Sequence, residues 1–362
     1  TYQAKLAIDQ ARGNLLPKLN IWQLAKVIID PMALLDVVQD VAPFLIPGNW
    51  FRLKETEILY AAQKEGYRAL WANELSAART LYFRVMMDHG LYDIVGQHLA
   101  DLTKAYEIAQ SRFLVGLEKV EIVRALEMQK LKLEEDKAQL ELLLQEELNA
   151  VSFSLGLPDN ETIVLAPLPL IKPSDEKPLA FDANIAVALN VSPESRQYDQ
   201  FLKVIPLIKK EVMFSVLGVS DFSRGVAGGI FDGIAIPSGL GFSTASTIRI
   251  IKTQKQILEN QRTGIIETLK RQLKNAVNTY NRIIDFYPNF ERRESLADAN
   301  IETINYKIVV GEKVNLLEIA DALETQTLSR AAKLEQIYRF RMNQDRFMRM
   351  MLSDEYARGP VN

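Results

Sequence analysis

The stretch YKIVVGEKVNLLEIADALET, residues 306–325, determines how we expect the second half of the chain to fold. A helical pattern runs into a lone glycine, Gly311, passes two charged residues and starts again as an apolar pair with acids three residues apart. A single glycine directly after a helical run is a common stop signal of an α-helix. The stretch therefore predicts two helices joined by a tight turn.

Nearly the same phrase occurs earlier, as RFLVGLEKVEIVRALEMQ over 112–129, about 195 residues before the second copy. The long helical patterns that lead to the two turns begin at Arg52 and Arg249, and they also align, so that Tyr82 matches Tyr280. Self-similarity at a fixed offset indicates a chain built from two structural repeats.

Each long pattern meets a helix-breaking residue at the same place, Gly90 in the first repeat and Pro288 in the second. Because two different breakers occupy one position, we expect a tolerated bend and not a loop. From Arg52 to Gly116 the helix would form a rod about 95 Å long at 1.5 Å per residue.

After each turn, apolar residues recur at the 3.5-residue spacing of a coiled-coil seam. In the first repeat the seam contains Leu126, Leu133 and Leu140. In the second repeat it contains Leu316, Ala320, Leu323, Thr327, Arg330, Leu334 and Ile337, and it is imperfect at Thr327 and Arg330. Each repeat is therefore predicted to form a long antiparallel helical hairpin.

A change of composition separates the two hairpins. Residues 155–182 carry five prolines between short apolar runs, which predicts strand and loop and not helix. Ser192 followed by Pro193 is typical of the start of a further helix, and residues 2–17 look like the counterpart of that helix in the first repeat.

Composition also limits the classes of protein to consider. The 362 residues are 48% hydrophobic and 25% charged with a net charge of −3, which predicts a folded protein without nucleic acid as a partner. The absence of cysteine excludes disulfides and thiolate metal sites. No apolar run approaches 18 residues, so no transmembrane helix is predicted. Thr1 does not begin a signal peptide, as expected of a processed or truncated chain.

Residue types that carry catalysis do not form a recognisable site. His89 and His98 lack the spacing that puts two metal ligands on one helix face, and both are expected to be helix-break or surface residues. The glycines of 225–242 lack a phosphate-binding motif, and no carboxylates are arranged to raise the pKa of one and leave its partner ionised. We therefore predict no enzyme, no cofactor and no bound metal.

The duplicated phrases at 112–129 and 306–325, together with LLPKLNI at 15–21, resemble the TolC-like outer-membrane efflux proteins. The resemblance covers nearly the whole chain. It implies that three protomers each give two hairpins to a hollow helical barrel across the periplasm, with an adaptor and an inner-membrane pump docked at the turns. In that family a strand segment from each half completes a barrel in the outer membrane.

The resemblance also assigns roles to residues near the turns. Adaptor docking would involve Gly116, Glu118, Lys119 and Val120 at one tip and Gly311, Glu312, Lys313 and Val314 at the other. The pore constriction would involve Glu318 and Asp321, with Arg124 and Glu127 at the matching positions of the first repeat. Carboxylates that converge in a pore favour cations and repel one another, and Lys313 or Arg124 of a neighbouring hairpin could hold such a ring closed. In the alternative interpretation these charges form a solvated helix face.

The segments that correspond to the membrane strands of the family depart from its pattern. A strand that spans the outer membrane needs about 9–11 residues of alternating polarity. Residues 19–50 contain Pro31, Pro43 and Pro47 and place apolar residues at helical spacing, and the alternation in 212–246 fails within a few residues. We therefore expect a TolC-like conduit whose membrane barrel is lost or remodelled.

The predicted fold is mainly α: duplicated long antiparallel hairpins in a trimeric α-barrel, with a small Pro-rich strand and loop equatorial region and atypical β-barrel segments. The predicted boundaries are 1–155 for the first repeat, with a remodelled barrel segment at 19–51 and a hairpin at 52–150; 156–191 for the Pro-rich equatorial segment; and 192–362 for the second repeat, with a remodelled barrel segment at 212–246 and a hairpin at 247–351.

Three functions remain open. The first is a homotrimeric conduit for efflux or type I-like secretion, in the periplasm and outer membrane of a Gram-negative bacterium. The second is a periplasmic structural or scaffold protein that keeps the helical trunk without spanning the outer membrane. The third, a cytosolic coiled-coil scaffold, is disfavoured by the two-fold repeat. The first two differ in whether 19–50 and 212–246 face lipid.

Overall fold

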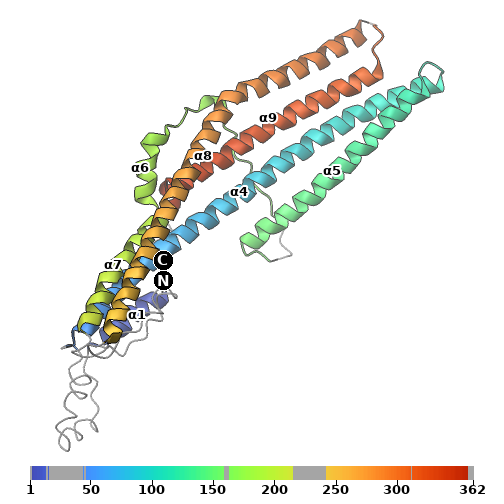
Figure 1. Ribbon diagram of the computed structural model, residues 1–362. Helices are drawn as coiled ribbons and strands as arrows, with labels where there is room; N and C mark the ends of the chain where they lie inside the picture. The colour runs from blue at the N-terminus through green and yellow to red at the C-terminus, as the bar shows by residue number, and fades with distance from the viewer. Residues whose placement is uncertain are drawn as a thin grey trace, which may run out of the picture. The chain divides into compact units, whose positions relative to one another are not determined.

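All regular structure in the described part of the chain is helical (Figure 1). The computed structural model describes residues 2–13, 15, 44, 46–158, 163–214, 242–310 and 312–357. The mainly α fold expected from the sequence is confirmed. Most of the two segments that correspond to membrane strands, 19–50 and 212–246, lies outside the described residues, so the remodelled barrel stays a prediction.

Two hairpins of equal dimensions dominate the fold, as the duplication predicted. The first pairs α4 (Pro47–Leu114) with α5 (Val120–Ser154), and the second pairs α8 (Phe242–Val309) with α9 (Leu316–Met350) (Figure 1). The first helix of each hairpin has 68 residues and the second has 35. Both long helices begin five residues before the hairpin boundaries predicted from the sequence, residues 52 and 247.

The two helix-breaking residues lie inside uninterrupted helices, which confirms that neither forms a loop. Gly90 is in α4 and Pro288 is in α8. A Cβ atom added at Gly90 would lie 2.7 Å from the Leu334 side chain of α9. Glycine at this position therefore lets a helix of one hairpin approach a helix of the other closely.

The chain divides into two compact units, and α4 and α8 each contribute to both of them. One unit comprises Thr1–Asn73, Asp182–Gln272 and Met350–Asn362, and the other comprises Glu74–Phe181 and Leu273–Arg349. We call the first the helical base and the second the hairpin unit.

In the helical base, α7 (Pro193–Phe214) packs its apolar face against α4 and α8. The buried core residues are Leu59 and Ala62 of α4, Phe201, Val204, Ile205, Ile208 and Val212 of α7, and Ile251 and Leu258 of α8. Burying a side chain of the size of Val, Leu, Ile or Phe stabilises a fold by about 1.5–3 kcal/mol. The short α1 (Tyr2–Gly13) belongs to the same unit and buries Ala7, Ile8 and Ala11.

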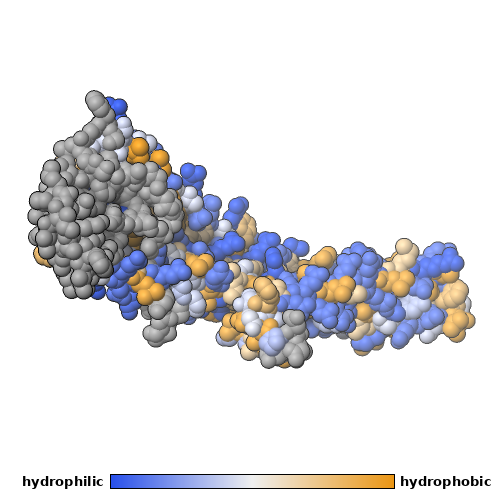
Figure 2. Space-filling model, turned by 90° about the horizontal axis from the view of Figure 1, so that it is seen from below, coloured by the Kyte–Doolittle hydropathy of each residue, from blue (hydrophilic) through white to orange (hydrophobic). Residues whose placement is uncertain are grey.

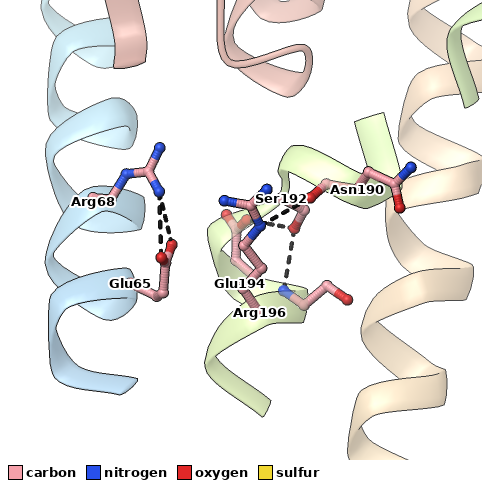
Figure 3. A network of polar contacts seen from close by, with 7 residues as sticks. Glu65, Arg68, Asn190, Ser192, Glu194 and Arg196 are labelled. Atoms are coloured by element: carbon pink, nitrogen blue, oxygen red, sulfur yellow. Dashed lines mark hydrogen bonds and ion pairs between the residues drawn. The ribbon is translucent and has the colours of Figure 1, made fainter. Parts of the chain in front are cut away.

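The predicted start of α7 is confirmed in atomic detail (Figure 3). The backbone N–H of Ser195 donates to Ser192 Oγ at 3.2 Å, and Ser192 Oγ in turn donates to Glu194 Oε2 at 2.9 Å. Arg196 Nε donates to the carbonyl of Asn190 at 2.9 Å, which ties α7 to the end of α6 (Phe181–Val191). The serine satisfies an N–H group that would otherwise lack a partner at the helix end.

In the hairpin unit, residues 163–180 form an extended strap, which is loop as predicted but contains no strand in this described range. Its only regular element is the single 3-10 turn η3 (Pro173–Asp175). Side chains of the hairpins bind the backbone of the strap: Tyr82 Oη donates to the Ala166 carbonyl at 2.6 Å, and Arg341 donates to the Pro169 carbonyl at 2.8 Å. Because side chains satisfy these polar groups, the strap needs no pairing strand.

Candidate functional site

The turn between α4 and α5 is a helix end of the Schellman type, built around Gly116. Gly116 has a φ of +74°, its N–H donates to the Phe113 carbonyl at 2.9 Å, and the Leu117 N–H donates to the Arg112 carbonyl at 2.8 Å. These two bonds satisfy carbonyls at the end of α4, and the left-handed backbone explains why glycine is at this position. The first tip is therefore a hydrogen-bonded turn.

The turn between α8 and α9 has a backbone hydrogen bond that corresponds to the one between Leu117 and Arg112 in the first turn. The Glu312 N–H donates to the Lys307 carbonyl at 2.9 Å, and the Asn315 side chain accepts from the Leu317 N–H at 3.0 Å at the start of α9. Gly311 itself lies outside the described residues. The sequence interpretation missed Asn315, although Asn is a favoured residue directly before a helix.

Large apolar side chains are exposed at both tips. Leu114 is 78% exposed and Val309 is 83% exposed. The full set is Phe113, Leu114, Val115 and Leu117 at the first tip and Tyr306, Ile308, Val309 and Val310 at the second. Figure 2 shows hydrophobic surface among charged side chains at the hairpin ends. Exposed apolar clusters rimmed by charge are typical of protein interaction surfaces. These side chains extend the predicted docking residues, among which Lys119, Glu312 and Lys313 are exposed and Glu118, Val120 and Val314 are partly exposed.

Beneath the tips, a shared core joins the two hairpins. It contains Leu102 and Ala109 of α4, Val123 and Leu126 of α5, and Leu316 and Ala320 of α9. The seam predicted from the 3.5-residue spacing is thus buried at Leu126, Leu316 and Ala320. Thr327 and Arg330, the imperfections of the seam, are half-buried, and Arg330 donates to Asp298 of α8 at 2.9 Å.

The four residues predicted to line a constriction all lie on exposed helix surface: Arg124, Glu127, Glu318 and Asp321. Glu318 Oε1 is 3.7 Å from Lys307 Nζ, an exposed pair that links α9 to α8. Exposed ion pairs contribute about 0–1 kcal/mol to stability. The role of these four residues in a constriction stays a prediction.

The two histidines differ in environment. His89 is exposed and lies 3.3 Å from Asp93, as expected of a surface residue. The prediction that His98 is a helix-break or surface residue is wrong, because His98 is buried in α4 and its Nδ1 has no hydrogen-bond partner in the described residues. Burial lowers the pKa of His98, whereas the nearby charges of Glu324 and Asp101 act in the opposite direction.

A pair of buried carboxyl groups bears on the expectation that no carboxylates are arranged to raise the pKa of one and leave its partner ionised, because the pKa of both groups is raised. Asp88 of α4 and Glu147 of α5 are both buried. Burial is the largest cause that raises the pKa of Glu147 to about 7, and the negative charge of Asp88 is the next largest. Glu147 is seven residues after Leu140, at the next position of the predicted seam. The heptad spacing was therefore the signal that could have identified a carboxyl group between the helices.

None of the described helices has a stretch of 18 residues apolar enough to cross a bilayer. No protein-family model matches this sequence, and no curated protein is significantly similar to it.

Several solved structures of outer-membrane channels have a similar fold. The CmeC outer membrane channel of Campylobacter jejuni has a TM-score of 0.66 and 12% identity, with 86% of this chain and 70% of that chain covered. The outer membrane protein VceC of Vibrio cholerae gives 0.66 and 12%, over 84% and 75% of the two chains. The open state of the MtrE outer membrane channel of Neisseria gonorrhoeae gives 0.65 and 12%, over 84% and 71%. The TolC-like fold expected from the resemblance is therefore shown.

Proposed function

Given a TolC-like channel fold, we propose that this chain forms a homotrimeric conduit in the envelope of a Gram-negative bacterium, for efflux or type I-like secretion. The observation that carries the proposal is the pair of hairpins with helices of 68 and 35 residues, each ending in an exposed apolar turn. An adaptor and a pump would dock at these tips. Transport would be passive, with opening by separation of the tips.

The acidic residues after the second turn give the proposal its sharpest test. In a trimer, three copies of Glu318 and Asp321 would surround one axis, where their charges bind cations and repel one another. Glu318 forms an exposed ion pair with Lys307, so the loss of the Glu318 carboxylate should hardly affect folding.

We predict that the double substitution Glu318→Ala and Asp321→Ala raises the leak conductance of the conduit in a planar bilayer and weakens its preference for cations. A matched variant, Asp285→Ala with Glu259→Ala, removes two exposed acids of α8 that lie far from the turn and should conduct like the unmodified protein. An unchanged leak in the first variant would remove both acids from the constriction.

The second candidate is a periplasmic scaffold that keeps the helical trunk without spanning the outer membrane. The prolines within 19–50 favour it, because they interrupt any membrane strand. The mass of the protein purified without detergent separates the candidates. A monodisperse species of about three times 41.0 kDa supports the scaffold, whereas aggregation that only detergent relieves supports the conduit.

A further inference from the structure

The buried carboxyl pair between α4 and α5 occupies a position that apolar residues normally fill. Asp88 is 6% exposed and Glu147 is 8% exposed. The buried Val85 precedes Asp88 by three residues, and the buried Val151 follows Glu147 by four, so each carboxyl shares a helix face with a core residue. Two acids therefore replace a hydrophobic contact of the first hairpin.

The positive charge near the pair is too weak to neutralise both acids. Arg84 Nε is 3.8 Å from Glu147 Oε1, but the Arg84 side chain is 65% exposed, so solvent screens its charge. Within the described part of the chain, Glu147 Oε2 is buried without a hydrogen-bond partner. His89, the next residue along α4, is exposed and paired with Asp93. Two ionised carboxylates here would be desolvated, close together and neutralised by one screened cation at most.

Proton binding removes this conflict, and the expected titration follows from the same contacts. Burial, and to a smaller extent the negative charge of Asp88, raises the pKa of Glu147 to about 7. Burial also raises the pKa of Asp88, whereas a hydrogen bond to Glu147 and the positive charge of Arg84 act in the opposite direction. A carboxylic acid can donate to a carboxylate, which satisfies both groups with one proton. With a pKa of about 7, Glu147 therefore holds a proton in mildly acidic solution.

We propose that Asp88 and Glu147 form a proton-dependent contact that holds the last turns of α5 against α4 and loosens when the shared proton is lost. Glu147 lies only seven residues before the end of α5 at Ser154. The chain then turns at Gly156, with a φ of +67°, towards the Pro-rich strap. The proposal concerns the packing of one hairpin and does not depend on the conduit function.

The direction of the pH dependence follows from linkage. The folded hairpin holds its proton up to a higher pH than the opened hairpin, in which Glu147 has its ordinary pKa. The contact is therefore fully stabilising below pH 4.5, the ordinary pKa of the group, and it weakens as the pH rises to about 7 and beyond. Between pH 6 and pH 8 the equilibrium constant for local opening should rise about tenfold.

Hydrogen exchange on the full chain measures this opening directly. Backbone protection is compared at pH 6 and pH 8, with intrinsic rates corrected for pH, in peptides that cover 141–154. Peptides that cover 337–350 of α9 serve as the internal reference. The unmodified protein should lose about tenfold protection in the α5 peptides only.

Three variants decide whether the acids are responsible. Glu147→Gln keeps the shape and supplies an amide donor without a titratable proton, so its α5 peptides should be equally protected at both pH values. Glu146→Gln changes the exposed neighbour and should behave like the unmodified protein. If Glu147→Gln fails to fold by circular dichroism, Asp88→Asn replaces it and should shift the loss of protection to lower pH. Equal protection at both pH values in the unmodified protein, or an unaltered pH response in Glu147→Gln or in its replacement, would overturn the proposal.

Discussion

At the scale of single residues, Gly116 in the turn after α4 and Gly264 inside α8 differ in whether the structure requires glycine. Gly116 has a left-handed backbone that a side chain would strain, although a Cβ atom there would meet no neighbour. Gly264 is inside α8, exposed, and also has open space where a Cβ atom would lie. The first glycine is required by backbone conformation, whereas nothing in the described structure requires the second.

We therefore predict stability changes of opposite sign for the same substitution. Gly116→Ala should destabilise the protein by about 1–2 kcal/mol, because alanine in the left-handed region is strained. Gly264→Ala should stabilise it by about 0.5–1 kcal/mol, because alanine loses less backbone entropy in a helix. Thermal unfolding followed by circular dichroism measures both, and the two variants serve as controls for each other. A stabilising Gly116→Ala would mean that the first tip does not adopt this turn.

At the same scale, the sequence indicated some site residues and not others. The tip residues were predictable because a glycine stop and the restart of a helix are local signals. The acid pair was not, since Asp88 and Glu147 are 59 residues apart and only the packing of α4 on α5 brings them together. His98 was misplaced for the same reason, because its burial depends on a neighbouring helix.

At the scale of elements, hairpins and strap differ in how far they could be predicted. The helical and heptad periods of α4, α5, α8 and α9 extend over many turns, so their existence and pairing were clear in advance. The strap has no period, and its path depends on side chains of distant helices. Asn281 of α8 shows this best: its amide accepts from the Leu179 N–H at 2.8 Å and donates to the Leu179 carbonyl at 2.9 Å.

We predict that Asn281→Ala frees this end of the strap. Loss of both hydrogen bonds leaves two backbone groups without their partner, which should cost about 1–3 kcal/mol and speed cleavage within 163–180 by a nonspecific protease. Asn278→Ala, an exposed asparagine on the same helix, should leave the cleavage rate unchanged. Equal rates in both variants would show that other contacts suffice to hold the strap.

At the scale of the whole molecule, the proposed trimer accounts for apolar surface that a single chain leaves exposed. Met128, Leu131 and Leu142 of α5 are exposed and lie within about one third of the helix circumference, because residues 3 and 11 positions apart share a face. Together they form an apolar stripe, interrupted by the exposed Glu135, that ends before the buried Glu147. A neighbouring protomer that packs against this stripe would remove it from water.

If this stripe is the contact between protomers, a charge on it should separate them. We predict that Leu131→Glu with Leu142→Glu lowers the mass measured by light scattering from about three times 41.0 kDa to a single chain, because desolvating two carboxylates in an apolar contact is costly. Helix content should stay the same, since both positions are exposed within the chain and glutamate is a good helix former. Gln145→Glu, an exposed polar position on α5, tests whether charge alone has this effect and should remain trimeric. A trimer that survives both leucine substitutions would mean that protomers associate through another face.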